Sequence, residues 1–161
     1  MKRLLFALSL IVIASCSRAQ NFIPDYKILT TDSTYTTQTA LKKNKPVMVI
    51  YFLPDCSHCQ HLAGEMKPKL AQFKNTQIVF ITATRTEYPY LNMIRDFSKN
   101  YGLDKYPNIT VGTEYPTYKV QQFYKLRSTP YVAIYDRTGT LLKTYEKVPK
   151  VDELLATLKK A

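Results

Sequence analysis

Two cysteines separated by two residues stand where a strand pattern ends and a helix pattern begins. Residues 47–53 carry almost no polar side chain, which is typical of a strand covered on both faces of a sheet. Cys56 and Cys59 follow this run and open a segment whose apolar residues recur at helical spacing. At a helix start, unpaired backbone N–H groups and the positive end of the helix dipole favour a thiolate. The placement therefore predicts a redox-active pair, in which Cys56 attacks and Cys59 resolves the mixed disulfide.

The remaining patterns predict one domain of mixed strands and helices. A chain of 161 residues is long enough to bury one sizeable core. Pro68 falls inside the helical pattern after the cysteines and is expected to kink that helix. The order of elements predicts an α/β fold, an α/β/α sandwich with a mixed central sheet and an N-terminal β-hairpin. The other expected elements are hairpin strands over 26–29 and 33–37, a short helix over 38–43, a strand over 78–83, a helix over 90–100, an extended segment over 108–113, a mainly helical stretch over 115–124, a second hairpin over 131–135 and 140–145, and a closing helix over 151–160.

The N-terminus has the composition of a secretory signal. Lys2 and Arg3 precede an apolar run over residues 4–14, interrupted only by Ser9. This run is too short to span a bilayer, and it has the length of the apolar region of a signal peptide. We therefore expect the chain to be exported to the bacterial periplasm, where it is soluble or tethered to the membrane.

Two cleavage sites fit this leader. Residues 13–16 resemble the lipobox of bacterial lipoproteins, so the leader could end at residue 15 and Cys16 could carry a lipid anchor. The small residues around position 19 suit an ordinary signal peptidase, which would remove residues 1–19. In either case the mature part, residues 20–161 or slightly more, is expected to be a single domain.

The charge and the cysteine count narrow the function further. The formal net charge is +11, or +9 without Lys2 and Arg3, and the lysines are spread over every segment. A nucleic-acid site would need a basic stripe with interleaved aromatic residues, so we expect no nucleic-acid partner. Acidic partner surfaces or anionic lipid headgroups suit this charge better. Once Cys16 is assigned to processing, the tight pair holds the only two cysteines left in an oxidising compartment.

Two histidines lie near the cysteines. His58 stands between them, where it could donate to the Cys56 thiolate and add positive charge; we therefore expect it to tune the pair towards a more oxidising potential. His61 completes a set that could suggest a zinc or copper site. However, residues 58, 59 and 61 point to different sides of a first helical turn, so we predict no metal.

At this point the chain resembles the thioredoxin superfamily, and more closely its exported TlpA/ResA-like branch, over roughly residues 22–160. The resemblance rests on the strand–Cys56-x-x-Cys59–helix unit and on Ser128-Thr129-Pro130 leading into the strand over 131–135. The N-terminal hairpin and an inserted segment near residues 101–103 are additions typical of that branch.

The resemblance implies a thioredoxin-like three-layer fold and a thiol–disulfide oxidoreductase. The Thr129–Pro130 bond would be cis, with Thr129 and Pro130 contacting an extended substrate segment. The substrates would be secreted or envelope proteins with thiols or disulfides. A membrane or periplasmic electron donor or acceptor would renew the pair, and no cofactor is needed beyond the Cys56–Cys59 disulfide.

The sequence departs from the family where the second cysteine needs a proton acceptor. Ile50 stands where classical thioredoxins have a buried aspartate, and a solvent-facing role is expected for Asp55 and Glu65.

The direction of exchange stays open, because the branch implies a reductant while His58 favours an oxidant. The alternative to an enzyme is a thioredoxin-fold binding module of an envelope assembly with little turnover. A peroxidase is disfavoured, since its nucleophile does not come from a tight Cys-x-x-Cys pair.

Overall fold

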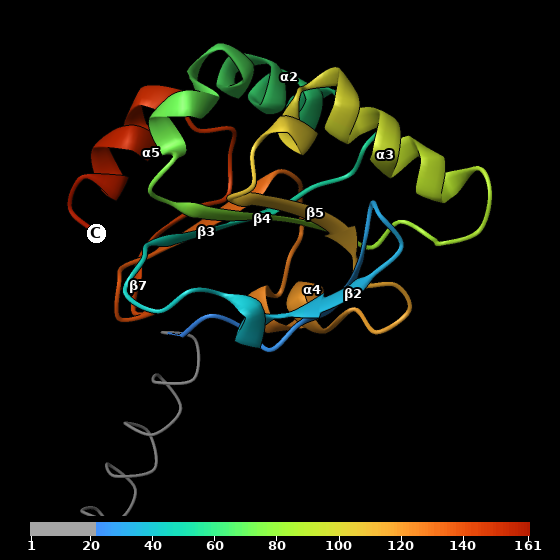
Figure 1. Ribbon diagram of the computed structural model, residues 1–161, viewed down its shortest axis with the longest axis horizontal. Helices are drawn as coiled ribbons and strands as arrows, with labels where there is room; N and C mark the ends of the chain where they lie inside the picture. Colours follow the sequence, from blue (N-terminus) through green and yellow to red (C-terminus); the bar gives the residue numbers. More distant parts are fainter. Residues whose placement is uncertain (1–21) are drawn as a thin grey trace, which may run out of the picture.

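The computed structural model describes residues 22–161, so the predicted leader and Cys16 lie outside the described residues. In this part of the chain one mixed sheet has the strand order β2-β1-β5-β4-β3-β6-β7. Helices α2, α3 and α5 cover one face of the sheet and α4 covers the other (Figure 1). The predicted three-layer sandwich is confirmed. The strands are β1 (Lys27–Thr30), β2 (Tyr35–Thr37), β3 (Val47–Tyr51), β4 (Gln77–Thr82), β5 (Ile109–Thr113), β6 (Tyr131–Tyr135) and β7 (Leu141–Tyr145), and the α-helices are α2 (Ser57–Met66), α3 (Tyr90–Asn100), α4 (Lys119–Tyr124) and α5 (Val151–Leu158).

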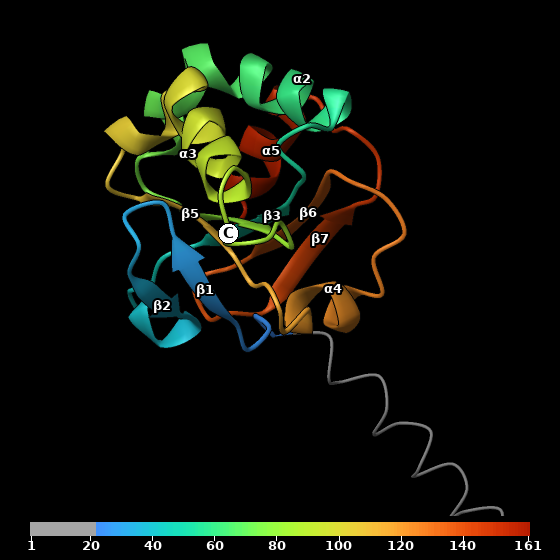
Figure 2. The same ribbon diagram turned by 90° about the vertical axis from the view of Figure 1, so that its right-hand side faces the viewer.

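β3 lies between β4 and β6 in the sheet. Every residue of β3 and β6 is buried, as expected for strands covered on both faces. β3 pairs in parallel with β4 and antiparallel with β6, so the carboxyl ends of β3 and β4 meet the start of β6 at one end of the sheet. The predicted N-terminal hairpin is β1–β2, and β1 joins the sheet through β5 (Figure 2).

The segment after the cysteines is helical but not uniformly so. α2 ends at Met66, and the chain continues as a 3-10 helix over Lys67–Phe73. Pro68 lies at the start of this second piece, where its lack of an N–H and its ring interrupt the α-helical hydrogen bonds. The predicted kink is therefore a change of helix type. Leu70 and Phe73 still point into the core, as their spacing indicated.

Two predicted helices are shorter than their sequence patterns. The stretch over 38–43 forms only a single 3-10 turn, Gln38–Ala40. The stretch over 115–124 is helical only in α4, because Pro116 and the left-handed backbone of Tyr118 (φ 52°) keep the first residues in a turn. No helix among residues 22–161 has the length and apolar character needed to cross a membrane.

A buried carboxylate holds α4 against the sheet. Glu114 directly follows β5 and is 1% exposed. Its Oε1 accepts a hydrogen bond from the Tyr51 hydroxyl at 2.9 Å, and its Oε2 accepts one from the backbone N–H of Val120 at 2.7 Å. The backbone N–H of Gln121 donates to Oε1 at 3.1 Å. This one side chain therefore ties β3 and the first turn of α4 together.

Gly112 in β5 marks the closest approach of β1. A Cβ at this position would lie 2.7 Å from the carbonyl oxygen of Leu29, a backbone atom that can move only if β1 moves. Gly112→Ala is therefore expected to lower the free energy of unfolding by about 2 kcal/mol, measured by urea denaturation. Gly64→Ala is the control, because a Cβ there meets only Tyr101 Cε1 at 3.8 Å. Alanine should stabilise α2 at that position, and equal effects of the two substitutions would contradict the close approach.

Candidate active site

The cysteine pair lies at the end of the sheet where β3 and β4 finish. Cys56 is the N-cap of α2, in an extended backbone conformation, and its carbonyl accepts the first helical hydrogen bond from the N–H of Gln60 at 3.0 Å. Cys56 is half-buried, whereas Cys59 in the first turn is 2% exposed. Both are free thiols in this structure. Only Cys56 is accessible to a partner from solvent.

The two thiols have opposite acidity. Burial acts to raise the pKa of Cys56, but hydrogen bonds with Thr129, with the Cys59 thiol and with the backbone N–H groups of Cys59 and His58 outweigh it, so the pKa lies below its usual value. Burial raises the pKa of Cys59 to about 12. Cys56 therefore ionises at a lower pH than Cys59, and it is the more reactive nucleophile of the two.

The loop before β6 forms a wall beside Cys56. The Thr129–Pro130 peptide bond is cis, as the resemblance implied. The Cys56 thiol donates to the Thr129 carbonyl oxygen at 3.6 Å across 73 residues of sequence. The fold thus brings together the four residues that the sequence placed at the exchange site: Cys56, Cys59, Thr129 and Pro130. Their roles stay predictions.

A groove of about 690 Å³ opens next to this wall. Pro130 is buried beneath it, and the half-buried Val148 and the buried Pro149 form its apolar side. Val148 and Pro149 belong to the loop between β7 and α5, and sequence reasoning missed them. The available signal in the sequence was Pro149 shortly before the closing helix. This signal does not show that its loop lies beside the loop of Thr129 and Pro130.

The histidines lie at the rim of the groove. His58 and His61 are both exposed, and His61 Nε2 is 3.5 Å from Glu65 Oε1 one helical turn later. Among residues 22–161, no three histidine, cysteine or acidic side chains gather as a metal ion would need. The contact from residue 58 that acts on the Cys56 thiol is made by its backbone N–H. Tuning by the His58 imidazole stays a prediction.

The surroundings of Cys59 are apolar. Ile50 packs in the same core cluster as Cys59, and Asp55 and Glu65 are both exposed. The buried carboxylate of Glu114 hydrogen-bonds to Tyr51, whose ring belongs to the core cluster on the other face of the sheet. Within the described residues, therefore, Cys59 has no buried carboxylate beside it to take its proton.

Two substitutions distinguish the effect of the His58 imidazole on Cys56 from that of the His58 backbone N–H. His58→Pro removes both the imidazole and the backbone N–H near Cys56, whereas His58→Ala removes the imidazole alone. Both should raise the pKa of Cys56 and make the pair more reducing, by about 30 mV for each pKa unit, with the larger effect for proline. Equilibration with glutathione measures the potential, and pH-dependent alkylation measures the pKa. An unchanged potential in His58→Pro would refute any tuning by this position.

A model of the thioredoxin-like domain matches residues 35–161, most of the chain. The chain belongs to the thioredoxin-like domain family. No curated protein matches it. Among solved structures, the thioredoxin-like chain is similar to a secreted Mycobacterium tuberculosis disulfide oxidoreductase homologous to E. coli DsbE, with 19% identity, a TM-score of 0.69, and 90% of this chain and 98% of that chain covered.

Two further solved structures share the fold. M. tuberculosis DsbF, solved in mixed oxidized and reduced forms, has 18% identity and a TM-score of 0.70, and the match covers 88% of this chain and 96% of that one. The exposed lipoprotein thioredoxin Etrx1 of Streptococcus pneumoniae has 22% identity and a TM-score of 0.63, with 85% and 99% covered. At these identities the likeness shows the thioredoxin-like fold, in which the cysteine pair and the Thr129–Pro130 loop meet.

Proposed function

We propose that this chain is an exported thiol–disulfide oxidoreductase of the TlpA/ResA-like branch. The observation that carries the proposal is the asymmetry of the pair: an accessible Cys56 with a lowered pKa lies against Thr129, and a buried Cys59 lies behind it. The attacking and the resolving thiol need these two environments. The similar secreted and exposed proteins support the proposal.

The exchange proceeds in two steps. The Cys56 thiolate attacks one sulfur of a substrate disulfide, which forms a mixed disulfide and releases the other substrate sulfur as a thiolate that takes up a proton. Cys59 then loses its proton and attacks Cys56 Sγ, which releases the second substrate thiolate and closes the Cys56–Cys59 disulfide. Two electrons pass to the substrate. Run backwards, the same steps oxidise a substrate dithiol, and no cofactor takes part.

We assign substrate binding to the groove beside Thr129 and Pro130. An extended segment of a secreted or envelope protein would pair with the backbone of Thr129 and lay its side chains against Val148 and Pro149. A membrane or periplasmic thiol protein would restore the pair. In the bacterial periplasm the domain would be released after Ala19 or tethered through a lipid on Cys16, and the intact mass of the mature protein distinguishes the two.

The experiment that tests the proposal is reduction of insulin by dithiothreitol in the presence of the full chain. Micromolar protein should accelerate insulin precipitation well above the uncatalysed rate. Equilibration with glutathione should then give a reduction potential, which sets the direction of exchange in the cell. No acceleration, together with stable binding of a protein disulfide, would favour the binding module, and the apolar surroundings of Cys59 are the observation that supports that alternative.

A further inference from the structure

Basic side chains gather at the end of the sheet opposite to Cys56. The strand directions place four loops there: those before β3, β4 and β5, and the turn between β6 and β7. α5 ends at the same place. These segments carry exposed cations, which we call the basic face: Lys42, Lys43, Lys45, Lys74, Lys105, Arg137, Lys159 and Lys160.

The acidic residues of this end are few and partly engaged. Asp104 is exposed. Asp136, next to Arg137, accepts hydrogen bonds from the backbone N–H groups of Thr138 at 2.8 Å and Thr140 at 3.0 Å, so its charge is partly compensated within the turn. The Cys56 end is more balanced, because Asp55, Glu87, Glu146 and Glu153 lie among its basic residues. The excess positive charge of the domain is therefore concentrated at the end of the sheet opposite to Cys56.

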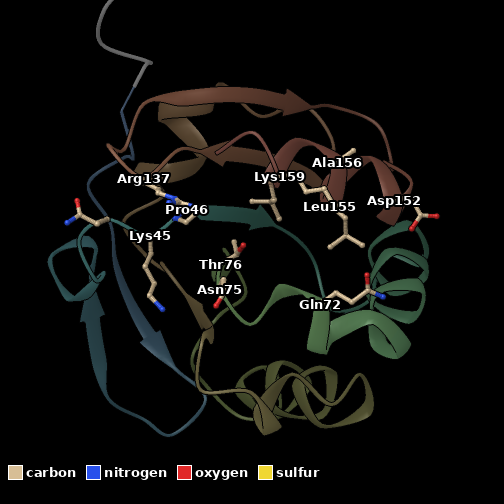
Figure 3. Close-up of a pocket in the computed structure, with 12 residues that line it drawn as sticks. Lys45, Pro46, Gln72, Asn75, Thr76, Arg137, Asp152, Leu155, Ala156 and Lys159 are labelled. Atoms are coloured by element: carbon tan, nitrogen blue, oxygen red, sulfur yellow. The ribbon is translucent and has the colours of Figure 1, made fainter.

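The basic face is recessed and not flat. A pocket of about 710 Å³ is lined by Lys45 before β3, Arg137 in the β6–β7 turn and Lys159 after α5 (Figure 3). Asp152, the acidic side chain of this pocket, lies apart from these three and is paired with Lys69 at 2.6 Å. Lys45 also lines a second pocket of about 370 Å³ with Lys42 and Lys74. Both recesses have the volume to admit a phosphate group.

The chain enters the domain at this same end. Phe22, the first described residue, forms a β-bridge with Thr140, and Ile23 lies near Gly139, so the start of the domain lies beside the turn that carries Arg137. In the sequence Cys16 is six residues before Phe22, a span of at most about 20 Å. A lipid on Cys16 would therefore hold this end, and not the Cys56 end, next to a bilayer.

We propose that the basic face docks onto an anionic phospholipid surface. The phosphates of headgroups such as phosphatidylglycerol occupy the recesses between Lys45, Arg137 and Lys159 and between Lys42 and Lys74. Cys56 and the substrate groove then point away from the membrane, towards soluble partners. The docking depends on surface charge alone, so it holds whether or not the cysteine pair turns over and whether or not Cys16 is lipidated.

Binding of the full chain to vesicles tests the proposal. Sedimentation is compared between vesicles with 30% phosphatidylglycerol in phosphatidylcholine and vesicles of phosphatidylcholine alone. Each Lys or Arg near an anionic surface strengthens binding about fivefold, so the triple variant Lys45→Gln, Arg137→Gln, Lys159→Gln should bind the anionic vesicles about 100-fold more weakly. The N-terminal apolar run is the same in both proteins, so it does not contribute to the difference.

The matched control removes the same charge from the other end of the domain. Arg85, Lys125 and Arg127 lie in exposed loops at the Cys56 end. Their triple replacement by glutamine should change binding by about twofold at most, because charges beyond about 10 Å from the surface are screened by salt. An equal loss in both triple variants would overturn the proposal in favour of attraction by net charge. Equal binding of the wild type to anionic and neutral vesicles would overturn it as well.

A second readout locates the face directly. On anionic vesicles, Lys45 and Lys159 should be protected from amine acylation, while the alkylation rate of Cys56 should be unchanged. Slower alkylation of Cys56 with unprotected Lys45 would mean that the opposite end docks and would overturn the orientation. Insulin reduction by the basic-face variant in solution should equal that of the wild type, which separates this proposal from the proposed exchange activity.

Discussion

Replacing Cys56 by serine is expected to abolish disulfide exchange. A hydroxyl near neutral pH is far less ionised than this thiol and cannot form a mixed disulfide, so the rate of insulin reduction should fall at least about a thousandfold. The half-buried position of Cys56 means that the substitution leaves the core intact, and the urea midpoint should stay close to that of the wild type. Comparison of turnover for the two proteins measures the effect. Exchange that survives in Cys56→Ser would contradict the assignment of the nucleophile.

Cys59→Ser should fail at a later step. Cys56 can still attack, but nothing resolves the intermediate, so a covalent complex with the substrate should accumulate and disappear on reduction. Non-reducing electrophoresis and mass spectrometry detect it. Ser57→Ala is the matched control, since Ser57 is exposed, lies between the cysteines and carries no thiol. A trapped complex in Cys56→Ser would reverse the two roles, and its absence in Cys59→Ser would contradict the resolving role of Cys59.

The sequence predicted those parts of the fold in which local pattern and burial agree. β3 and β6 are continuous apolar runs, and no other element type buries five such residues on both sides. α3 spans the predicted residues 90–100, and it ends there because left-handed Gly102 follows Tyr101 and stops the helix. At 115–124 the apolar spacing predicted more helix than forms, because the turn around Pro116 decides where α4 starts.

The site was predictable as far as its residues carry a motif. The Cys56–Cys59 spacing and the Thr129–Pro130 pair are read from sequence, whereas their approach across 73 residues was implied only by the resemblance to the thioredoxin superfamily. Val148 and Pro149 carry no chemistry of their own, and only the position of their loop makes them part of the groove. The basic face was hidden for the same reason, since its cations come from loops dispersed along the chain and look like general surface charge.

The division of the molecule into two ends follows from the direction of the strands. Parallel β3 and β4 place Cys56 at their carboxyl ends and the lysine-bearing loops at their amino ends. α5 returns from the first end to the second and adds Lys159 to the basic face. The shared direction of β3 and β4 therefore separates the exchange site from the proposed membrane contact. Substitutions in one of these two surfaces need not affect the other.

Glu114→Ala is expected to be the most destabilising single substitution proposed for the scaffold. It leaves the N–H groups of Val120 and Gln121 without their acceptor in a buried place, and it leaves the Tyr51 hydroxyl only a long contact with Gln121 Oε1 at 3.5 Å. Loss of this network should lower the free energy of unfolding by about 3 kcal/mol or more, measured by urea denaturation. Glu114→Gln keeps one carbonyl acceptor and should cost about half as much. Glu146→Ala, at an exposed glutamate, should stay within about 0.5 kcal/mol.

The part of the domain that is destabilised in Glu114→Ala distinguishes a local role of Glu114 in holding α4 from a general loss of packing. If Glu114 holds α4, amide exchange in α4 should accelerate more than amide exchange in α2, which packs on the other face of the sheet. A double-mutant cycle with Tyr51→Phe should give a coupling of about 1 kcal/mol or more, since the two side chains share a hydrogen bond. A cost below 1 kcal/mol for Glu114→Ala would contradict this role of Glu114. Because α4 leads into the loop of Thr129, which contacts Cys56, a loosened α4 should also weaken substrate binding.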